Sequence, residues 1–407
     1  MATAILVINV GSSSLKFAIY RERGGDLILT GGGQAASGEG RVYFEAKDRA
    51  GTLLENESWP AKEGLTGRPL DVMRCWTEAH LGSDHVLAVG HRIVHGGSEF
   101  TGPVLIDSTV LNRLSTLNAL APLHQPHNLA AVSRLMAVYP DVPHVACFDT
   151  AFHSSQAPVV TRFGLPREFY VAGIRRYGFH GLSYEYIARA LRVIAPELAD
   201  GRVIVAHLGN GASMCAIHAG RSVETTMGLT PLDGLPMGTR CGELDPGVVL
   251  YLIRQRGMSP EAVEDLLYHR SGLLGLSGVS SDMRQLLASD EPSAGEAIES
   301  YVFSIAREIG ALTAGLGGLD ALVFTGGVGE HAPGIRASVC ERSAWLGIRL
   351  DPAANATGGP LISIPRAQPS VWVIPADEQK MIALQTWELV KDRGDRAGLP
   401  LARKNYS

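Results

Sequence analysis

The sequence predicts an α/β protein of two domains, and three observations lead to that prediction. The chain has 407 residues, more than the roughly 250–300 that one hydrophobic core usually supports. Short apolar runs typical of buried strands alternate with segments of helical periodicity. A hydrophobic hairpin pattern also occurs twice, since residues 5–19 align with residues 203–217 at a constant offset of 198, with Gly11 opposite Gly209. Two such hairpins can look alike by chance, but each copy stands near the start of one half, which favours a duplicated domain.

The expected strands are short apolar runs that end at a turn or a polar residue, at 5–10, 15–20, 86–90, 144–148, 321–325 and 371–374. Helical patterns lie within 122–134 and over 184–194, 260–269, 296–316 and 378–391. Ser259 and Pro260 form a favourable N-cap and first-turn pair. The Gly-rich, polar segment 24–65 predicts irregular hairpins. We expect one domain of residues 1–152, joined by a C-terminal helix of about 380–407, and a second domain of residues 153–379.

Composition and charge exclude several classes of protein. A net charge of −5 and a pI near 6.2, without a basic stripe, argue against a nucleic-acid binder. No uninterrupted apolar run reaches the ~18 residues of a membrane span, and the N-terminus lacks the basic flank of a signal peptide. Five scattered cysteines without a CxxC pair fit a reducing compartment. We therefore expect a soluble, cytoplasmic protein without nucleic-acid or membrane partners.

The turn between the first two expected strands has the composition of a phosphate site. Glycine and serines at residues 11–14 can expose backbone N–H groups and hydroxyls to an anion. The chain has six lysines against thirty arginines, and none between Lys62 and Lys380. Lys16 therefore looks selected as a compact point charge. The alternatives are an ordinary hairpin with a surface lysine, and an Asn9 that ends a strand instead of binding a metal.

Two further glycine motifs suit a nucleotide. The chain has no GxxxxGK[ST], no GxGxxG after a strand, no HExxH and no GxSxG. A nucleotide site must therefore be of another kind. Residues 207–211 form the second hairpin turn, and residues 325–331 follow an expected strand and precede an expected helix. Their glycines permit close backbone approach to a phosphate or nucleoside, although tight turns alone would explain them too.

Charged residues stand where strands are expected to end. Arg92 and Arg240 lie beside glycines, where a guanidinium suits carboxylate or phosphate oxygens, or forms a structural ion pair. Asp149 directly follows an apolar strand, a position used for chemistry in α/β enzymes, or caps a turn. His180 lies between glycines, as a ligand-facing loop residue would. His91 and His95 do not indicate a metal site, because a strand and turn between them would not place both on one face.

Several strings are highly specific, above all NVGSSSLKF (9–17), RRYGFHG (175–181) and MGTRCGELDP (237–246). The chain resembles the acetokinase family, within the superfamily of actin-like, chaperone and sugar-kinase ATPases, in order along essentially its whole length. The resemblance implies duplicated ribonuclease-H-like (actin-like ATPase) α/β domains, the second of which binds nucleotide, with the active site in the interdomain cleft. It also implies a homodimer that reversibly transfers the ATP γ-phosphoryl group to acetate with Mg²⁺ or Mn²⁺, giving acetyl phosphate and ADP. Propionate or butyrate is the alternative acid.

The resemblance assigns roles to residues of this sequence. Catalytic roles fall to Asp149, His180 and Arg240. Arg92 would bind the carboxylate of the acid, with Val94, Leu123, His124, Phe179 and Pro231 around its methyl group. The nucleotide site would be lined by Ser12, Lys16, His207, Leu208, Gly209, Asn210, Gly211, Asp282, Met283, Arg284, Gly327, Val328, Gly329, Glu330 and His331. Asn9 and Glu378 would hold the metal ion.

The sequence departs from the family pattern at four places: Gln125, residues 182–184, His331 and Asp377. None removes a charged catalytic group, and His331 bears on nucleotide preference. A carboxylic acid is already ionised at neutral pH, so we expect Asp149 to orient groups rather than abstract a proton. An ATP-switched binding module and a sugar kinase are the other classes. The converging arginines and histidine, the lack of an appended binding domain and an apolar acid pocket argue against both.

Overall fold

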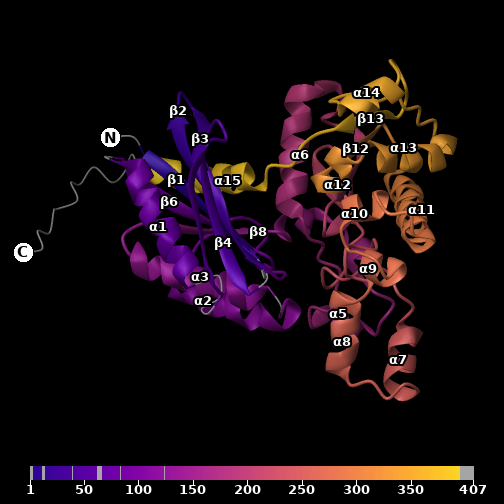
Figure 1. Cartoon of the computed structure of the whole chain (residues 1–407), viewed down its shortest axis with the longest axis horizontal. Coiled ribbons are helices and arrows are strands. Elements are labelled where there is room, and N and C mark those ends of the chain that lie inside the picture. The colour runs from indigo at the N-terminus through magenta and orange to yellow at the C-terminus, as the bar shows by residue number, and fades with distance from the viewer. Residues whose placement is uncertain are drawn as a thin grey trace, which may run out of the picture. The chain divides into compact units, whose positions relative to one another are not determined.

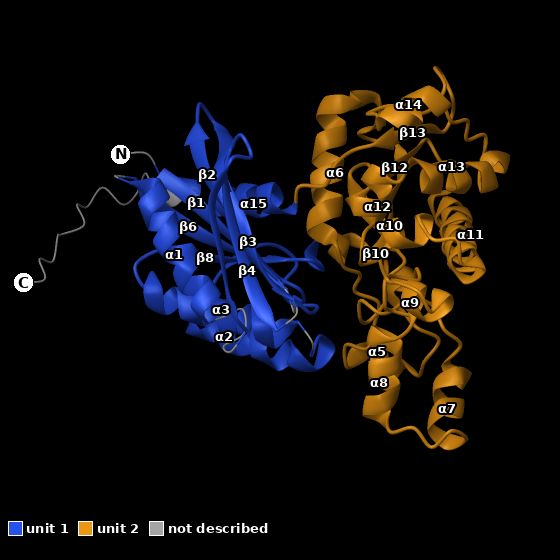
Figure 2. Cartoon of the chain, viewed as in Figure 1, with its two compact units in different colours: residues 1–151, 378–407 blue, residues 152–377 orange. Residues whose placement is uncertain are grey.

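The computed structural model describes residues 3–11, 14–38, 40–61, 67–82, 84–122 and 124–394. The chain divides into two compact units, coloured separately in Figure 2. Unit 1 comprises residues 1–151 and 378–407, and unit 2 comprises residues 152–377. None of the described helices combines the length and the hydropathy that crossing a membrane would require.

Unit 1 contains an eight-stranded sheet in the order β5-β4-β3-β2-β1-β6-β8-β7. Its antiparallel part is β1 (Thr3–Val10), β2 (Ser14–Arg23), β3 (Asp26–Gly38), β4 (Arg41–Asp48) and β5 (Leu53–Pro60). Next to β1 lie the parallel strands β6 (His85–Ile93) and β8 (His144–Phe148), and the short β7 (Val104–Leu105) pairs antiparallel with β8. The described part of the hairpins predicted over 24–65 forms long antiparallel strands, with register shifts between Ile19 and Tyr20 and between Ala46 and Lys47. Residues 62–65 of this prediction lie outside the described residues.

Helices cover both faces of the unit 1 sheet. Alternate residues of β1, from Ala4 to Val10, pack with α1 (Arg68–Leu81) and α3 (Gln125–Val138). The other face meets α15 (Glu378–Gly394), whose Thr386 and Ile382 lie so near Gly90 that a Cβ there would clash with both. Figure 1 shows this C-terminal helix beside the N-terminal strands. The unit also contains α2 (Ser108–Ser115) and the 3-10 helix η1 (Thr116–Leu120).

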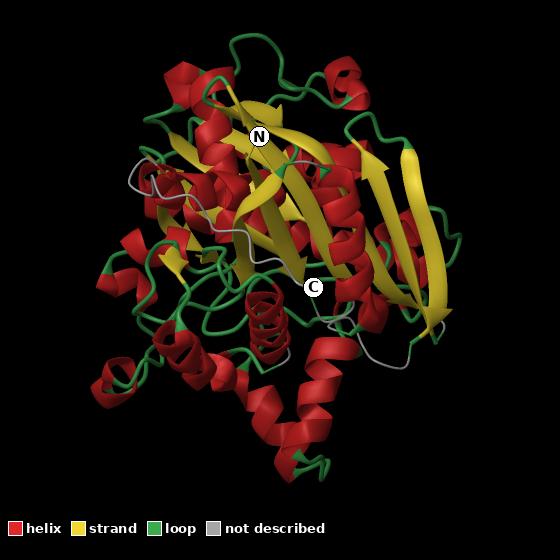
Figure 3. Ribbon diagram, turned by 90° about the vertical axis from the view of Figure 1, so that its left-hand side faces the viewer, coloured by secondary structure: helices red, strands yellow, loops and turns green. Residues whose placement is uncertain are grey.

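Unit 2 contains a five-stranded sheet in the order β11-β10-β9-β12-β13. The strands are β9 (Arg202–Leu208), β10 (Ala212–His218), β11 (Arg221–Thr225), β12 (Ala321–Thr325) and β13 (Ser370–Val373). One face packs against α6 (Gly181–Ile194), and the long α11 (Pro292–Leu316) also contacts β9, β10 and β11. Figure 3 shows strands and helices in separate colours.

The remaining elements of unit 2 are short, and they carry most of its loops. They are η2 (Ala151–Ser155), α4 (Pro158–Thr161), α5 (Arg167–Val171), η3 (Pro196–Leu198), α7 (Pro246–Arg254), α8 (Pro260–His269), α9 (Gly272–Ser277), α10 (Met283–Leu287), α12 (Gly326–His331), α13 (Pro333–Arg342), η4 (Ala344–Leu346) and α14 (Pro352–Thr357). The predicted cap of α8 is confirmed, since the Ser259 hydroxyl accepts a hydrogen bond from the backbone N–H of Ala262 at 3.2 Å.

The two sheets share one topology. In each, three antiparallel strands (β3-β2-β1 and β11-β10-β9) are followed by two parallel ones (β6-β8 and β12-β13). The constant offset of 198 is wrong in one respect. Val10 pairs with Leu15 across residues 11–14, whereas Leu208 pairs with Ala212 across the shorter 209–211. The first strands therefore align at an offset of 198 and the second strands at 197.

The glycines of β3 allow a test of the tight packing in this sheet. A Cβ on Gly33 would lie 2.1 Å from the backbone oxygen of Glu45, so Gly33→Ala must push strands apart. We expect it to lower the free energy of unfolding by about 2–3 kcal/mol, measured by urea denaturation. Gly38→Ala in the same strand is the control, because its Cβ would meet only Tyr43 at 3.9 Å. Equal effects of the two substitutions would contradict this account.

Candidate functional site

In unit 1, a buried ion pair lies where the parallel strands end. Arg92 lies near the end of β6, Asp149 directly follows β8, and Asn9 lies near the end of β1. The Arg92 guanidinium donates from Nε and Nη2 to the two Asp149 oxygens at 2.9 and 2.6 Å, and from Nη1 to Asn9 Oδ1 at 3.2 Å. These bonds use three of its five N–H groups. One N–H on each Nη atom remains for a ligand.

The charges of this pair depend on burial and on Glu378. Burial lowers the pKa of Arg92, but the carboxylates of Asp149 and Glu378 more than compensate, so its pKa lies above the ordinary value. Burial raises the pKa of Asp149 although Arg92 opposes the shift, and Glu378 raises it further. Arg92 is therefore permanently charged. Its charge interacts with two carboxylates: Asp149, which it hydrogen-bonds, and Glu378, which acts through its charge.

Lys16 lies on the same face of the sheet as Asn9, because the two are directly opposed across β1 and β2. Its side chain is exposed and lines a hollow of about 420 Å³, together with Gln34, Glu45 and Gln379. Ser12, predicted beside Lys16, falls outside the described residues. Unit 1 thus contains Asn9, Lys16, Arg92, Asp149 and Glu378 of the predicted site.

Two buried amides that the sequence reasoning missed hold this edge in place. Asn128 accepts from the backbone N–H of Val94 at 3.0 Å and donates to the oxygen of Val10 at 2.6 Å. Gln125 accepts from the N–H of His95 at 3.2 Å and donates to its oxygen at 3.0 Å. The available signal was a pair of amides three residues apart on the buried side of α3. Gln125, noted only as a departure from the family, is a structural residue.

The histidines near Arg92, His91 and His95, bond different groups. His91 Nε2 lies 2.9 Å from His144 Nδ1, while His95 Nδ1 accepts from the N–H of Gly97 at 2.9 Å. The two side chains therefore face different partners, as expected for a strand followed by a turn. Across the described ranges, the structure shows no group of three His, Cys, Asp or Glu residues arranged to hold a metal.

In unit 2, His180 is held by a hydroxyl relay. It has a left-handed backbone, with φ of 57°, directly before α6. Its Nδ1 lies 2.8 Å from the Ser213 hydroxyl, which also bonds the hydroxyl of Tyr184. Burial raises the pKa of Tyr184 well above its ordinary value, so the phenol keeps its proton. Ser213 and Tyr184 were missed, although Tyr184 stands at one of the departures from the family pattern.

His207 and Arg240 gather around His180. The rings of His180 and His207 stack with centroids 4.4 Å apart, and His207 Nδ1 lies 2.8 Å from the hydroxyl of Ser183. A Cβ on Gly211 would lie 3.3 Å from His180 Nε2 and 3.9 Å from Arg240 Nη1. His180 Nε2 and Arg240 Nη1 therefore both border the space that Gly211 leaves open. The structure brings these four predicted residues together.

A hollow of about 470 Å³ joins three predicted segments that are far apart in the sequence. Its predicted lining residues are Gly209, Asn210, Asp282, Met283, Arg284, Gly327, Val328 and His331. Leu273, Ser281, Leu287 and Ala332 complete the lining, and the sequence reasoning missed them. Asp282 caps α10 and forms an ion pair with Arg284 at 2.6 Å on the rim.

Comparisons with known proteins identify the family. The model of the Acetokinase family matches residues 4–384. The chain belongs to the acetokinase family. It is 53% identical to an acetate kinase of Rhodopseudomonas palustris over 96% of this chain and 99% of that protein, and 51% identical to one of Rhizobium meliloti over 95% and 98%.

Solved structures show the same fold. The Porphyromonas gingivalis acetate kinase matches with a TM-score of 0.84 and 35% identity, covering 95% of this chain and 100% of that one. A Francisella tularensis propionate kinase matches with 0.86 and 34%, covering 95% and 99%. The predicted α/β, actin-like fold is confirmed. As an acetokinase, the protein is a kinase that transfers a phosphoryl group to a carboxylate.

Three of the residues that the resemblance assigns to the nucleotide site of this acetokinase make structural contacts. Leu208 is buried in the sheet, and Gly329 packs against Phe324 and the backbone of Ala206. Glu330 Oε1 accepts from the N–H groups of Gly326 at 2.9 Å and Ala376 at 3.1 Å. None of the three lines the 470 Å³ hollow. Leu208 is apolar, Gly329 has no side chain and Glu330 caps backbone N–H groups, so each is used in packing or capping. The predicted loop at 325–331 contains the short helix α12.

The predicted acid pocket draws on both units. Val94 and the half-buried His124 belong to unit 1, whereas the buried Phe179 and Pro231 belong to unit 2. Leu123 falls outside the described residues. The grouping of these side chains around a methyl group therefore stays a prediction, as does the meeting of the unit 1 and unit 2 residues in one cleft.

Arg336 holds α12 from its other end and gives a test of that helix. Its fully buried side chain donates from Nη1 to the oxygens of Gly329 and Glu330 at 2.9 and 2.8 Å, and from Nε to Asn355 Oδ1 at 2.8 Å. Arg336→Met would leave these buried acceptors unsatisfied. We expect a loss of about 2–4 kcal/mol in the free energy of unfolding. Relative to the parent enzyme, the KM for the nucleotide should rise more than the KM for the acid.

Arg342→Met is the matched control on the same helix. Arg342 is exposed, pairs with exposed Glu299 at 2.8 Å and lies 6.0 Å from the centroid of the Phe303 ring, so its loss should change stability by less than about 1 kcal/mol. An unchanged nucleotide KM in a folded Arg336→Met enzyme would show that Arg336 does not position α12.

Proposed function

We propose that this acetokinase is an acetate kinase, which reversibly transfers the γ-phosphoryl group of ATP to acetate and forms acetyl phosphate and ADP. One observation carries the proposal. Each unit presents half of the required chemistry, with Arg92 beside Asp149 in unit 1 and His180, His207 and Arg240 around Gly211 in unit 2. The acetate kinases of high identity and coverage support the choice of acid.

The acid side follows from the donors of Arg92. An acetate oxygen would accept from the two N–H groups that Asp149 and Asn9 leave available, while the other oxygen attacks the γ-phosphorus. The new P–O bond forms as the bond to the β-phosphate oxygen breaks. No proton moves, because acetate is ionised and the leaving ADP takes the electron pair as an anion. Asp149 then serves to orient Arg92.

On the nucleotide side, positive charge and open backbone do the work. Phosphoryl transfer through a loose transition state depends mainly on positioning and on charge around the transferring group. His180 Nε2 and Arg240 Nη1 border the space over Gly211 and would bind the equatorial oxygens. The hollow lined by Gly209, Asp282 and Gly327 would hold the rest of the ATP, with Lys16 contributing charge from unit 1.

Residues of unit 1 also fit a divalent cation. Mg²⁺ in such enzymes is bound by one or two carboxylates, waters and phosphate oxygens rather than by a protein cage. Glu378 supplies a carboxylate near Arg92 and Asp149, and Asn9 Oδ1 retains a lone pair after accepting from Arg92. Mg²⁺, or Mn²⁺, would neutralise charge on the phosphates there. A homodimer in a reducing cytoplasm completes the proposal, and none of the five described cysteines forms a disulfide.

The choice of acid is tested by trapping the product. The enzyme is incubated with MgATP, hydroxylamine and acetate, propionate or butyrate, and the acyl hydroxamate is measured. We expect kcat/KM to be highest for acetate and to fall by about 10-fold or more with added methylenes, since each is worth ~1–3 kcal/mol in an apolar pocket. Highest activity with propionate would favour the activity named for the Francisella tularensis neighbour. No product from any acid would refute the kinase proposal.

The role of Asp149 is tested by pH. We expect Asp149→Asn to lower kcat by about 100-fold, because Arg92 loses its bidentate partner and its position. The slope of log kcat against pH near neutrality should stay that of the parent enzyme, since no proton is abstracted. Asp107→Asn, at an exposed helix cap where asparagine also caps well, is the control. A changed slope in Asp149→Asn would show that Asp149 is a general base.

A further inference from the structure

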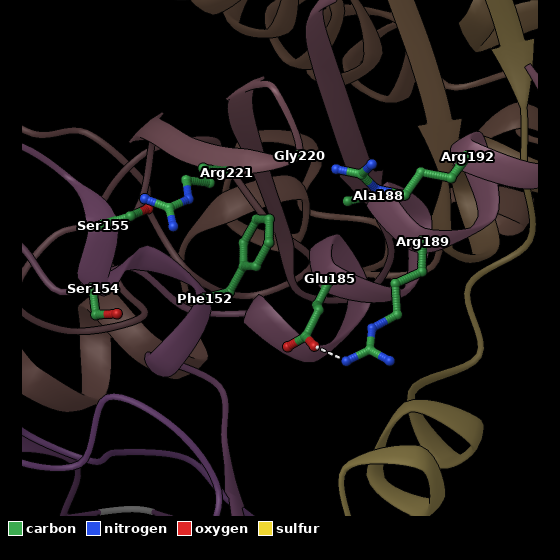
Figure 4. Close-up of a pocket in the computed structure, with 9 residues that line it drawn as sticks. All are labelled: Phe152, Ser154, Ser155, Glu185, Ala188, Arg189, Arg192, Gly220 and Arg221. Carbon is green, nitrogen blue, oxygen red and sulfur yellow. Dashed lines mark hydrogen bonds and ion pairs between the residues drawn. The ribbon is translucent and has the colours of Figure 1, made fainter. Parts of the chain in front are cut away.

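Unit 2 contains a second hollow of about 470 Å³, which we call the arginine hollow. Its walls come from η2, α6 and the turn between β10 and β11, and Figure 4 shows its side chains. None of its lining residues lines the hollow that contains Gly209 and Gly327, and none borders Gly211. It therefore has no part in the proposed phosphoryl transfer, and its chemistry needs a separate explanation.

The arginine hollow is positively charged in a protein of net charge −5. Arg189, Arg192 and Arg221 line it with a single carboxylate, Glu185. Arg189 donates to Glu185 at 2.9 Å, which neutralises one of the three. Arg192 and Arg221 make no side-chain hydrogen bond or ion pair with any part of the chain that the structure describes. Two guanidinium groups thus remain for oxyanions, which they bind in a bidentate manner.

The donors lie at two ends of the arginine hollow. Figure 4 shows Arg192 and Arg221 on opposite sides of the Phe152 ring, with the hydroxyl of Ser155 near Arg221. The Arg192 guanidinium lies over Gly220, where a Cβ would be 2.8 Å from Nη2, so this glycine gives the guanidinium its space. An apolar ring between two cationic ends matches a compact molecule with an anionic group at each end and carbon between them.

We propose that the arginine hollow binds a small organic polyanion, with one anionic group on Arg221 and another on Arg192, and that this ligand is an effector of the kinase. Phosphate and carboxylate groups both suit a guanidinium fork. A phosphorylated metabolite and a polycarboxylate are therefore the two sources to separate by experiment. The effector role rests on the proposed kinase function, whereas the binding site does not.

A short chain of hydrogen bonds links the arginine hollow to His180. Ser155 donates to the oxygen of Ser222 at 2.9 Å, and the Ser222 hydroxyl lies 2.9 Å from His153 Nδ1. His153 Nε2 lies 2.9 Å from the oxygen of Phe179, the residue before His180. The carbonyl can only accept, so Nε2 carries the proton and Nδ1 accepts from Ser222. Burial lowers the pKa of His153 to about 4, which keeps this tautomer neutral.

This chain predicts how an occupant acts. A ligand on Arg221 pulls on the first residues of β11, where the next residue, Ser222, bonds His153. Movement of His153 shifts the oxygen of Phe179 and with it the backbone of His180. We therefore expect the ligand to change kcat rather than the KM of either substrate.

Binding is tested by isothermal titration calorimetry on the full-length protein. The probes are tricarballylate and propane-1,3-bisphosphonate, with a saturating non-hydrolysable ATP analogue present so that the nucleotide site is occupied. The variant is Arg192→Gln/Arg221→Gln, and Arg349→Gln is the control, since Arg349 is an exposed arginine of unit 2 outside the hollow. We expect at least one probe to bind the parent and the control equally, and the double variant at least 10-fold more weakly. The preferred probe identifies the chemical class.

Two outcomes would overturn the proposal. They are no binding of either probe to the parent at millimolar concentration, and equal binding to the parent and the double variant. If the double variant does not fold, Ser154→Asp places a negative charge at an exposed position of the same wall and should weaken binding in the same way.

The effector role is tested separately by hydroxamate formation. The probe that binds should change kcat at least twofold in the parent and in Arg349→Gln but not in the double variant. Binding without any change in kcat would refute the effector role and leave the site. Absence of kinase activity in every protein would instead count against the proposed function, and the calorimetric result would stand.

Discussion

The bidentate pair between Arg92 and Asp149 is the interaction on which the organisation of unit 1 depends. Both groups lie largely out of water, where an ionised side chain is tolerated only if it is paired and hydrogen-bonded. Pairing requires β6 and β8 to be parallel neighbours, so that their ends bring the two residues to one edge. The C-terminal helix α15 adds a second carboxylate, Glu378, whose charge raises the pKa of both Arg92 and Asp149. The order of the strands and the return of the chain in α15 thus bring these three charged residues to one edge of unit 1.

Unit 2 differs in that it provides an open space bordered by hydrogen-bond donors. The stacked rings of His180 and His207 are each fixed by a serine hydroxyl, and Gly211 leaves room beside them. The helix α12 is fixed at one end by the carboxylate of Glu330 and at the other by the buried guanidinium of Arg336. Rigid supports around an unfilled volume are what electrostatic stabilisation of a transferring group demands, since donors that are already in place need no reorganisation.

Sequence reasoning found most elements of the fold and many residues of the candidate site. Strands such as 144–148 and 321–325 were predicted with their observed bounds, because a buried strand in a parallel sheet must be continuously apolar. The hairpins over 26–60 were predicted only as irregular and without strand bounds, because their glycines fit close strand packing as well as loops. Supporting side chains such as Asn128, Ser213 and Arg336 were missed, since their partners are distant in sequence and only the folded chain brings them together.

The unequal turns of the two hairpins determine which residues of the two sheets correspond. With the corrected alignment, the opposed pair Asn9 and Lys16 corresponds to the opposed pair His207 and Ser213, each the second pair from its turn. The corresponding places in the two sheets therefore carry different chemistries. Unit 1 has an amide opposite a cation, and unit 2 has a histidine opposite the serine whose hydroxyl supports His180. One shared topology thus supplies unlike groups from the two units, as a reaction between unlike substrates requires.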